Sequence, residues 1–311
     1  TVMKKLTKKS KVINLGCRLN FFESEIIENI LKKEKDVSKV VINTCAVTNN
    51  AVQKSIYAVK KALKDFPNSE VIVTGCASQV EKNRFENLGH ISKIVDNKLK
   101  TNPNSYISED WVHEQTFNFP SIDYLSTQRT RAMLQIQQGC NHRCTFCIIP
   151  YGRGDAVSLT FTEISKRVKK ILSSGITEIV LTGVDLTSYG EDLKGKPKLG
   201  SILKKLFKLF PNLPRLRLSS IDPAEIDRDL LDLFKYERRL MPYLHLSLQS
   251  GDNLILKRMK RRHNREMVLN ICNNLKSFRK DITFGADLIV GFPTETDENF
   301  QNSINLITEC Q

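Results

Sequence analysis

The chain has 311 residues, enough to bury the cores of two domains. Lys and Arg outnumber Asp and Glu by 14, which favours an anionic partner such as a nucleic acid, although a solvated basic surface would also account for it. No run approaches the roughly 20 apolar residues of a membrane span, and the basic start lacks the apolar stretch of a signal peptide. We therefore expect a cytoplasmic protein without a membrane partner.

The first hundred residues alternate between short apolar runs and segments of helical length. The runs predict strands at 12–15, 39–42 and 70–73, and the segments between them predict helices at 22–33, 49–66 and 78–88. This alternation is typical of βαβ units on a parallel sheet.

Each of these three runs ends near a cysteine, namely Cys17, Cys45 or Cys76. Parallel strands place their carboxyl ends at one edge, where open α/β sheets bind ligands, so we expect the three thiols to meet there. Gly16 and Gly75 would let the backbone approach a bound group. The alternative is that each cysteine is a small buried hydrophobic residue, but three equivalent positions make that less probable than a ligand role.

Residues 97–131 mix Pro, Asn, Ser and Thr without periodicity, which predicts a linker with one short strand at most. The single tryptophan, Trp111, falls in this segment, and we interpret it as a packing residue. We place the domain boundary here, between a first domain at 9–120 and a second at 126–311.

Three closely spaced cysteines follow the linker: Cys140, Cys144 and Cys147. The segment is too short for useful disulfides, so a metal site is the better interpretation. Structural zinc takes four ligands, and no histidine is spaced to complete a zinc finger, which leaves a zinc knuckle as the weaker alternative. Three thiolates on a cubane iron–sulfur cluster would leave one iron open to a substrate or cofactor.

From residue 131 onward strands and helices alternate without a break. The predicted strands are 132–138, 178–182, 215–219, 244–249 and 281–290, and the predicted helices are 161–174, 199–210, 224–236, 265–278 and 297–310. Five strand and helix pairs predict a partial α/β barrel.

These strands carry polar residues on one face and leucines on the other. The polar positions are Gln135, Gln137, Arg217, Ser219, His245, Ser247, Gln249, Gly285 and Asp287. Because the apolar face would pack under the helices, the polar face should line the interior. A polar interior indicates a cavity that holds a ligand.

A basic segment follows the fourth predicted strand. Its cationic residues are Lys257, Arg258, Lys260, Arg261 and Arg262. At the mouth of a barrel they would contact RNA phosphates, and the alternative is a solvated loop. We interpret Cys272 and Cys310 as packing residues without partners and expect His142 to shape the cysteine loop.

The stretch Cys140-Asn141-His142-Arg143-Cys144-Thr145-Phe146-Cys147 resembles the signature of the radical S-adenosylmethionine (SAM) enzymes. The resemblance implies that SAM chelates the open iron and that Phe146 lies beside its adenine. It also implies that Gly183 and Asp185 form the site of the methionine amino group. Asp185 would accept a hydrogen bond from this group. By the same resemblance Ser219 and Gln249 face the ribose and the methionine carboxylate of SAM. Ile289 and Gly291 flank its adenine.

Three further stretches resemble the amino-terminal domain of the radical SAM methylthiotransferases: Leu15-Gly16-Cys17-Arg18-Leu19-Asn20, Asn43-Thr44-Cys45-Ala46-Val47-Thr48 and Gly75-Cys76. The resemblance implies that Cys17, Cys45 and Cys76 hold a second [4Fe–4S] cluster beside that of Cys140, Cys144 and Cys147. The expected fold is α/β: a Rossmann- or flavodoxin-like parallel-sheet domain, then a partial radical SAM barrel without its last strand. We also expect the family's carboxyl-terminal TRAM domain to be absent.

Within that family, the stretches 147–154, 216–223 and 259–263 resemble the branch that acts on N6-threonylcarbamoyladenosine (t6A) beside the tRNA anticodon. The resemblance implies SAM used twice, as methyl donor and as radical source, together with an electron donor and a sulfur source. Arg153 is a further candidate RNA contact, although Asp155-Ala156-Val157-Ser158 departs from the arginines expected after it. The alternatives are isopentenyladenosine tRNA or ribosomal protein as substrate, or an iron–sulfur-binding remnant without turnover.

Overall fold

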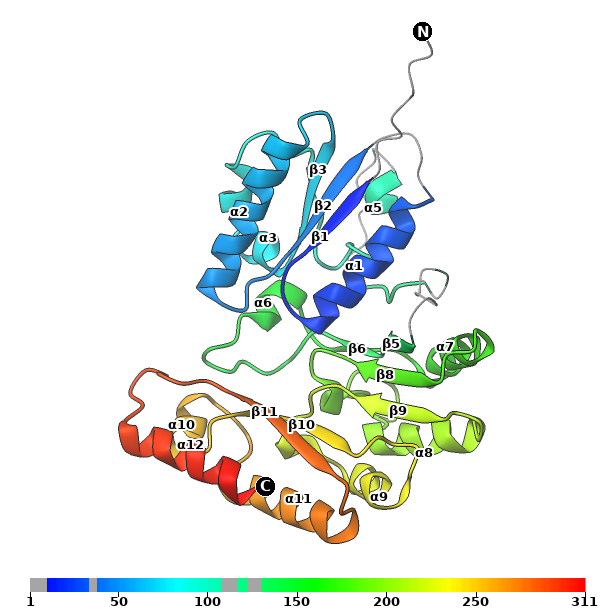
Figure 1. The fold of residues 1–311 in the computed structure, drawn as a ribbon, viewed down its shortest axis with the longest axis vertical. Coiled ribbons are helices and arrows are strands. Elements are labelled where there is room, and N and C mark those ends of the chain that lie inside the picture. The colour runs from blue at the N-terminus through cyan, green and yellow to red at the C-terminus, as the bar shows by residue number, and fades with distance from the viewer. Residues whose placement is uncertain (1–9, 34–37, 108–116, 122, 124–129, 311) are drawn as a thin grey trace. The chain divides into compact units, whose positions relative to one another are not determined.

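A computed structural model describes residues 10–33, 38–107, 117–121, 123 and 130–310. Trp111 and the expected boundary at residue 126 lie outside these residues. The chain forms two compact units, one of residues 1–126 with 148–154 and one of residues 127–147 with 155–311 (Figure 1). The short segment 148–154, which we expected in the second domain, thus belongs to the first unit.

The first unit contains a four-stranded sheet in which all neighbours are parallel. In sheet order its strands are β1 (Lys11–Asn14), β2 (Lys39–Thr44), β3 (Glu70–Gly75) and β4 (Lys93–Ile94). Its helices are α1 (Arg18–Leu31), α2 (Asn49–Asp65), α3 (Cys76–Val80), α4 (Lys82–Glu86), α5 (Asn104–Ile107) and α6 (Ile149–Arg153). The expected βαβ order is confirmed.

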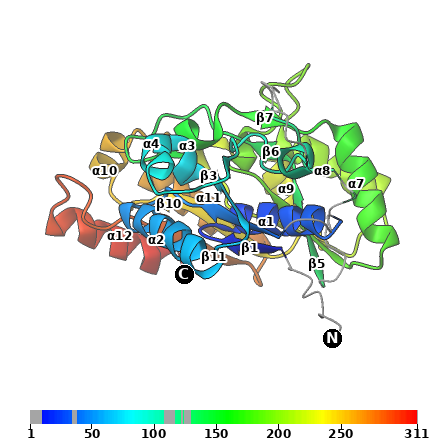
Figure 2. The ribbon, with the colours of Figure 1, turned by 90° about the horizontal axis from the view of Figure 1, so that it is seen from above.

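Side-chain alternation along the central strands builds a core on both faces of this sheet. Val40 and Ile42 of β2 pack with Val59 of α2 in one buried cluster. Val41, between them, is also fully buried and must point to the opposite face. Helices α1 and α2 lie on opposite sides of the sheet in both views (Figures 1 and 2). This double cover explains why the strands are continuous apolar runs.

The second unit carries five parallel strands in chain order. Strands β5 (Arg131–Gln135), β8 (Glu178–Thr182) and β9 (Arg215–Leu218) form one sheet, and β10 (Tyr243–Gln249) pairs with β11 (Thr283–Leu288). Two isolated parallel bridges, Leu216 to Leu240 and Ile221 to Leu246, connect the two sheets. A short antiparallel pair joins β6 (Gln137–Gln138) to β7 (Val157–Ser158). The mixed α/β class with parallel sheets is confirmed.

Helices separate these strands along the chain. They are α7 (Phe161–Ser173), α8 (Leu199–Leu209), α9 (Arg228–Tyr236), α10 (Asn253–Arg258), α11 (Arg265–Phe278) and α12 (Asp297–Glu309), with 3₁₀ turns η2 (Leu186–Ser188) and η3 (Pro223–Glu225). Along β10 the leucines at 244, 246 and 248 are buried, whereas the residues between them are half-buried. Leu246 and Leu248 face side chains of α11 and α12. The apolar face therefore packs under the helices, as predicted.

Three elements differ from the sequence-based expectation. The helix expected over 78–88 is two short helices, because the backbone of Glu81 leaves the helical region. Helix α10 was not predicted. It begins where the Asp252 carboxylate accepts hydrogen bonds from the amides of Leu254 and Ile255. The described part of the expected linker contains α5, a short helix that was not predicted.

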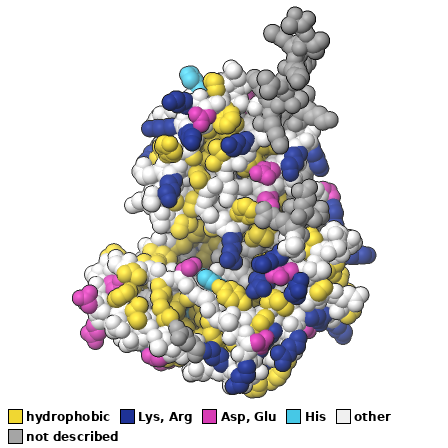
Figure 3. Space-filling model, viewed as in Figure 1, with side chains coloured by type: hydrophobic (Ala, Val, Ile, Leu, Met, Phe, Trp, Pro, Cys, Tyr) yellow, Lys and Arg dark blue, Asp and Glu magenta, His cyan; other side chains and the backbone are white. Residues whose placement is uncertain are grey.

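Helix α12 presents an apolar face to solvent. Phe300, Ile304 and Ile307 share this face at helical spacing and are each more than a third exposed. Hydrophobic side chains gather over the part of the second unit that carries α12 and β11 (Figure 3). Within the described residues β11 pairs with β10 alone.

None of the helices in the described part of the chain is long and apolar enough to cross a membrane.

Gly75 supports a stability prediction. Its φ is +102°, and an added Cβ would lie 2.4 Å from the carbonyl oxygen of Thr44. Gly89, in the same unit, has a similar φ of +117° but meets nothing closer than 3.8 Å. We expect Gly89→Ala to cost about 1 kcal/mol through backbone strain and Gly75→Ala to cost several-fold more. Urea unfolding of both variants measures the difference, and equal costs would contradict the close approach at Gly75.

Candidate functional site

The first three cysteines lie at one edge of the amino-terminal sheet. Cys17 caps the start of α1 after β1, Cys45 directly follows β2, and Cys76 begins α3 after β3. Because Asn14 is in register with Asn43 and Thr44 with Gly75, the three strands end side by side. Cys45 and Cys76 are buried, whereas Cys17 is exposed.

The three thiols are close enough to interact electrostatically. Burial raises the pKa of the Cys45 thiol, and Cys17 and Cys76 add to that rise. An added Cβ on Gly16 would lie 2.6 Å from the sulfur of Cys45, so only glycine permits this approach. The structure thus brings together the residues that we expected to meet.

The other cysteine trio lies in the loop after β6, and all three thiols are half-buried. Backbone contacts hold this loop. The Thr145 hydroxyl donates to the carbonyl of Arg258 at 3.0 Å, and the Thr145 amide donates to that of Met259 at 3.2 Å. The guanidinium of Arg261 approaches the sulfur of Cys144, with Nη1 at 3.8 Å. A cation therefore faces this trio.

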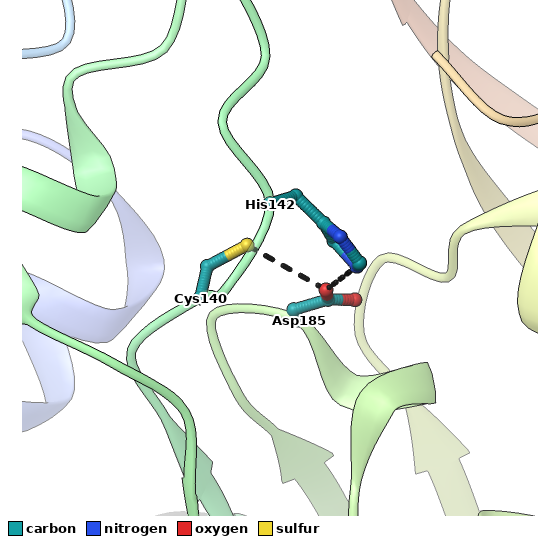
Figure 4. Close-up of side chains that lie close together, drawn as sticks. All are labelled: Cys140, His142 and Asp185. Atoms are coloured by element: carbon teal, nitrogen blue, oxygen red, sulfur yellow. Dashed lines mark hydrogen bonds and ion pairs between the residues drawn. The ribbon is translucent and has the colours of Figure 1, made fainter. Parts of the chain in front are cut away.

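Cys140, His142 and Asp185 lie together, with the aspartate reaching the other two from the loop after β8 (Figure 4). The Asp185 Oδ2 atom is 2.9 Å from His142 Nε2 and 3.6 Å from Cys140 Sγ. Hydrogen bonds to Asp185 and Glu225 raise the pKa of His142 to about 9. Burial, then Asp185, raises the pKa of Cys140 to about 12. His142 thus shapes the loop through Asp185, as expected.

Two polar atoms of the second unit lack a protein partner among the described residues, one on Ser219, expected beside SAM, and one on Gln135, expected to line the interior. The Ser219 hydroxyl and the Gln135 side-chain carbonyl are buried and accept no hydrogen bond within the described residues. Such atoms need a polar partner, either a ligand or a water molecule, since burying them unpaired is costly. Gly183 packs against Gln137, whose side-chain oxygen accepts from the amides of Val184 and Asp185. This chemistry fits a small polar cofactor at the carboxyl ends of the strands.

The remaining expected contacts are distributed along β10, β11 and the cysteine loop. The Ile289 amide donates to the Gln249 carbonyl at 2.9 Å, so these two residues are held together. Gly291 adopts a φ of +73° with open space where a side chain would lie. Phe146 is half-buried.

Two of the predicted RNA contacts require correction, and a third is paired with acidic residues. Arg153 is buried, and its guanidinium donates two hydrogen bonds to the Glu23 carboxylate, at 2.7 and 3.0 Å. Arg261 is almost fully buried and donates to Asp222, and Arg262 is bound by Asp222 and Glu225. The donors of Arg153 and Arg261 are therefore used inside the fold, whereas the Arg262 side chain is 36% exposed. Lys257, Arg258 and Lys260 are exposed, although Arg258 also donates to Thr294.

We expected Cys272 and Cys310 to lack partners, and this expectation is wrong. Their thiols lie close to each other, and this proximity together with burial raises the pKa of Cys272. Both line an apolar cavity of about 390 Å³ bounded by β10, β11, α11 and α12. The sequence spacing could not show this pair because it joins two helices.

Asp222 is a residue whose role the sequence did not reveal. Burial alone would raise the pKa of its carboxyl, but His263, Arg261 and Arg262 hold that pKa well below the usual range. Its Oδ2 atom is 2.9 Å from a nitrogen of each arginine. Asp222 therefore orders the basic segment, including the arginine that faces Cys144.

We expect Asp222→Asn to destabilise the chain by about 3 kcal/mol at pH 7, because two cations then lose a buried partner. The pKa of the Asp222 carboxyl is lower in the folded than in the unfolded chain, where it is about 4. The extra stability of the wild type over the variant is therefore fully present above about pH 4 and is lost as the pH falls through the folded pKa. Urea unfolding at pH 7 and below pH 4 measures this. Asp229→Asn, which removes an exposed partner of Lys204, is the control and should have no measurable effect.

Comparison with known proteins identifies relatives of both units. Residues 134–307 match the Radical SAM superfamily, and residues 9–96 match the Uncharacterized protein family UPF0004. The threonylcarbamoyladenosine tRNA methylthiotransferase MtaB of Rickettsia prowazekii is 42% identical, over 97% of this chain and 73% of the relative. MtaB of Bacillus subtilis is 34% identical over 95% and 69%. The tRNA-2-methylthio-N(6)-dimethylallyladenosine synthase of Ehrlichia canis is 34% identical over 95% and 72%.

Solved structures share the fold at low sequence identity. The radical SAM methyltransferase TsrM from Kitasatospora setae, with cobalamin and a [4Fe–4S] cluster bound, matches with a TM-score of 0.68 at 12% identity, covering 98% of this chain and 70% of that one. The cobalamin-dependent SAM radical enzyme OxsB matches with a TM-score of 0.59 at 13% identity, covering 91% and 45%. At these identities the likeness shows the fold alone.

Proposed function

Because the chain belongs to the tRNA methylthiotransferase family of the radical SAM superfamily, we propose that it adds a methylthio group to C2 of t6A beside the tRNA anticodon. Enzymes of this family use SAM and iron–sulfur clusters. The proposal is supported by two separate cysteine trios, one after the strands of the first unit and one in the loop after β6 of the second. The substrate rests on the relatives, since the 42% identical protein is named for t6A and the isopentenyl-type relative is 34% identical.

We assign one [4Fe–4S] cluster to Cys17, Cys45 and Cys76 and another to Cys140, Cys144 and Cys147. Three thiolates per cubane leave one iron without a protein ligand. When bound, the clusters and SAM supply the radical and methyl-transfer chemistry, while the protein positions and shields them. A sulfur source and an electron donor come from outside the chain, and we expect the reaction to take place in the cytoplasm.

The residues of the second unit have distinct parts in binding SAM. Ser219 offers a buried hydroxyl without a protein partner. Asp185 retains acceptor capacity for an amino group, because within the described residues its Oδ1 atom accepts a hydrogen bond from the Thr187 hydroxyl alone, at 3.3 Å. Gly183 allows the strand end to lie against Gln137. Arg261 keeps a cation near Cys144, where it stabilises a thiolate ligand.

Anaerobic reconstitution followed by three measurements tests the proposal. We expect about eight iron atoms per chain, SAM cleavage under reducing conditions, and 2-methylthio product on t6A-containing tRNA by mass spectrometry. Replacing either cysteine trio by alanine should halve the iron content and abolish the product. Only the loss of Cys140, Cys144 and Cys147 should also abolish SAM cleavage.

Each alternative has its own outcome in this experiment. Product on isopentenyladenosine tRNA or on ribosomal protein, without product on t6A, would overturn the substrate assignment. Two clusters without SAM cleavage would indicate an iron–sulfur protein without turnover. Stoichiometric zinc in place of iron would refute both cluster assignments.

Two exposed lysines, Lys257 in α10 and Lys260 just after it, generate a prediction about tRNA binding. Lys257→Ala with Lys260→Ala should weaken binding and reduce the slope of log affinity against log salt by about two, because each lysine neutralises one phosphate. Lys205→Ala with Lys208→Ala, which removes two exposed lysines of α8, is the matched control. Filter binding across a salt series measures both. Equal slopes in the two double variants would exclude α10 from the tRNA contact.

A further inference from the structure

A series of side-chain contacts in the second unit connects Asp185 with Arg262. The His142 Nε2 atom lies 2.9 Å from Asp185 Oδ2 and 3.4 Å from Glu225 Oε1. Arg262 donates to the same Glu225 oxygen and, at 2.9 Å, to Asp222 Oδ2. The series therefore joins the cysteine loop after β6 to the loop after β8, to η3 and to the basic segment. Glu225 is its middle member, because it contacts both His142 and Arg262.

Glu225 is an ionised carboxylate inside this series. Its side chain is 15% exposed. Burial alone would raise the pKa of Glu225, but His142 and Arg262 lower that pKa to about 2. An ionised carboxylate can only accept hydrogen bonds, so the Nε2 atom that faces it carries the hydrogen. One N–H of His142 therefore lies between two acidic side chains, and Glu225 draws the imidazole away from Asp185.

The orientation of Asp185 depends on the same histidine. Its Oδ2 atom faces His142 at 2.9 Å and Cys140 Sγ at 3.6 Å, whereas its Oδ1 atom accepts from the Thr187 hydroxyl at 3.3 Å. The two oxygens cannot exchange places without breaking the contact with His142. An imidazole held by Asp185 alone could swing toward that carboxylate and occupy it. Contact with Glu225 opposes this movement and keeps Asp185 available to a ligand.

Arg262 fixes Glu225 in place. Its guanidinium bridges Glu225 and Asp222, and Asp222 also binds Arg261. A bridged carboxylate has already lost its side-chain freedom in the folded chain, so a ligand need not order it on binding. The contacts behind Asp185 are therefore preorganised.

We propose that Glu225 is a positioning residue for SAM. Acting through His142, it holds the Asp185 carboxylate in the orientation that accepts the amino group of the cofactor. The inference rests on the proposed function, because it takes Asp185 as part of the SAM site. Glu225 acts on SAM only through the histidine, so its effect should disappear when His142 is replaced.

The test measures the binding of two probes to the full chain after anaerobic reconstitution. S-adenosylhomocysteine carries the amino and carboxylate groups of SAM without the methyl group that SAM donates, and 5′-methylthioadenosine lacks both of these groups. Equilibrium dialysis without reductant gives the two affinities. We expect Glu225→Gln to weaken S-adenosylhomocysteine binding about tenfold, as is typical when a residue that orients a ligand-binding group is lost. Binding of 5′-methylthioadenosine should not change.

Glu163→Gln is the matched control, because it removes an exposed partner of Lys166 in the same unit and should change neither affinity. Equal losses for the two probes in Glu225→Gln would indicate a general structural defect and would refute the positioning role. An unchanged affinity for S-adenosylhomocysteine would also refute it.

A double-variant cycle tests the route through the histidine. His142→Asn should weaken S-adenosylhomocysteine binding, and adding Glu225→Gln should cause no further loss, because residues that act in series are not additive. Additive losses would show that Glu225 acts independently of His142 and would contradict the inference.

Failure of this inference differs from failure of the proposed function. If the parent chain gains no iron on reconstitution or binds neither probe, the proposed SAM site is wrong. If the parent binds both probes and Glu225→Gln binds them equally well, only the positioning role is lost. Iron content and far-UV circular dichroism check each variant. Should Glu225→Gln lose its iron, Glu225→Asp, which keeps the charge on a shorter side chain, must lose affinity for S-adenosylhomocysteine alone, and loss of iron there too would refute the inference.

Discussion

The structure depends on a geometric constraint, which is that parallel strands in register end at the same edge of their sheet. In the first unit this constraint brings Cys17, Cys45 and Cys76 together although some thirty residues separate each from the next. In the second unit it brings Asp185, Ser219 and Gln249 to the carboxyl ends of β8, β9 and β10. The helices that follow the strands cover the sheets and leave these ends available for ligands.

Buried ion pairs provide the second level of organisation. Glu23 holds α6 in the first unit through Arg153, and Asp222 orders the basic segment of the second unit through Arg261 and Arg262. Burying a charge is costly unless it is paired, so each carboxylate determines where its arginines lie. Both networks reach the candidate ligands, since Arg261 approaches Cys144 and Arg153 lies beside Gly152, which packs on Cys76. Cations therefore accompany both cysteine trios.

The arginines also limit what can be concluded from a basic composition. The chain has 14 more basic than acidic residues, yet Arg153 and Arg261 have almost no exposed side chain. They serve internal electrostatics and not an anionic partner. A basic residue counts toward nucleic-acid binding only if it reaches solvent, as Lys257 and Lys260 do.

The sequence by itself determined the class of fold, the alternation of strands and helices, and the cysteines expected as ligands, because apolar periodicity and residue spacing are local signals. Tertiary structure alone decided which charges are buried. Glu23 meets Arg153 across 130 positions and Cys272 meets Cys310 between two helices, and no local pattern encodes such pairs. It also decided that Glu81 interrupts a predicted helix, since a backbone break can depend on packing elsewhere. Long-range contacts form only when the whole chain has folded, so their partners cannot be inferred from spacing.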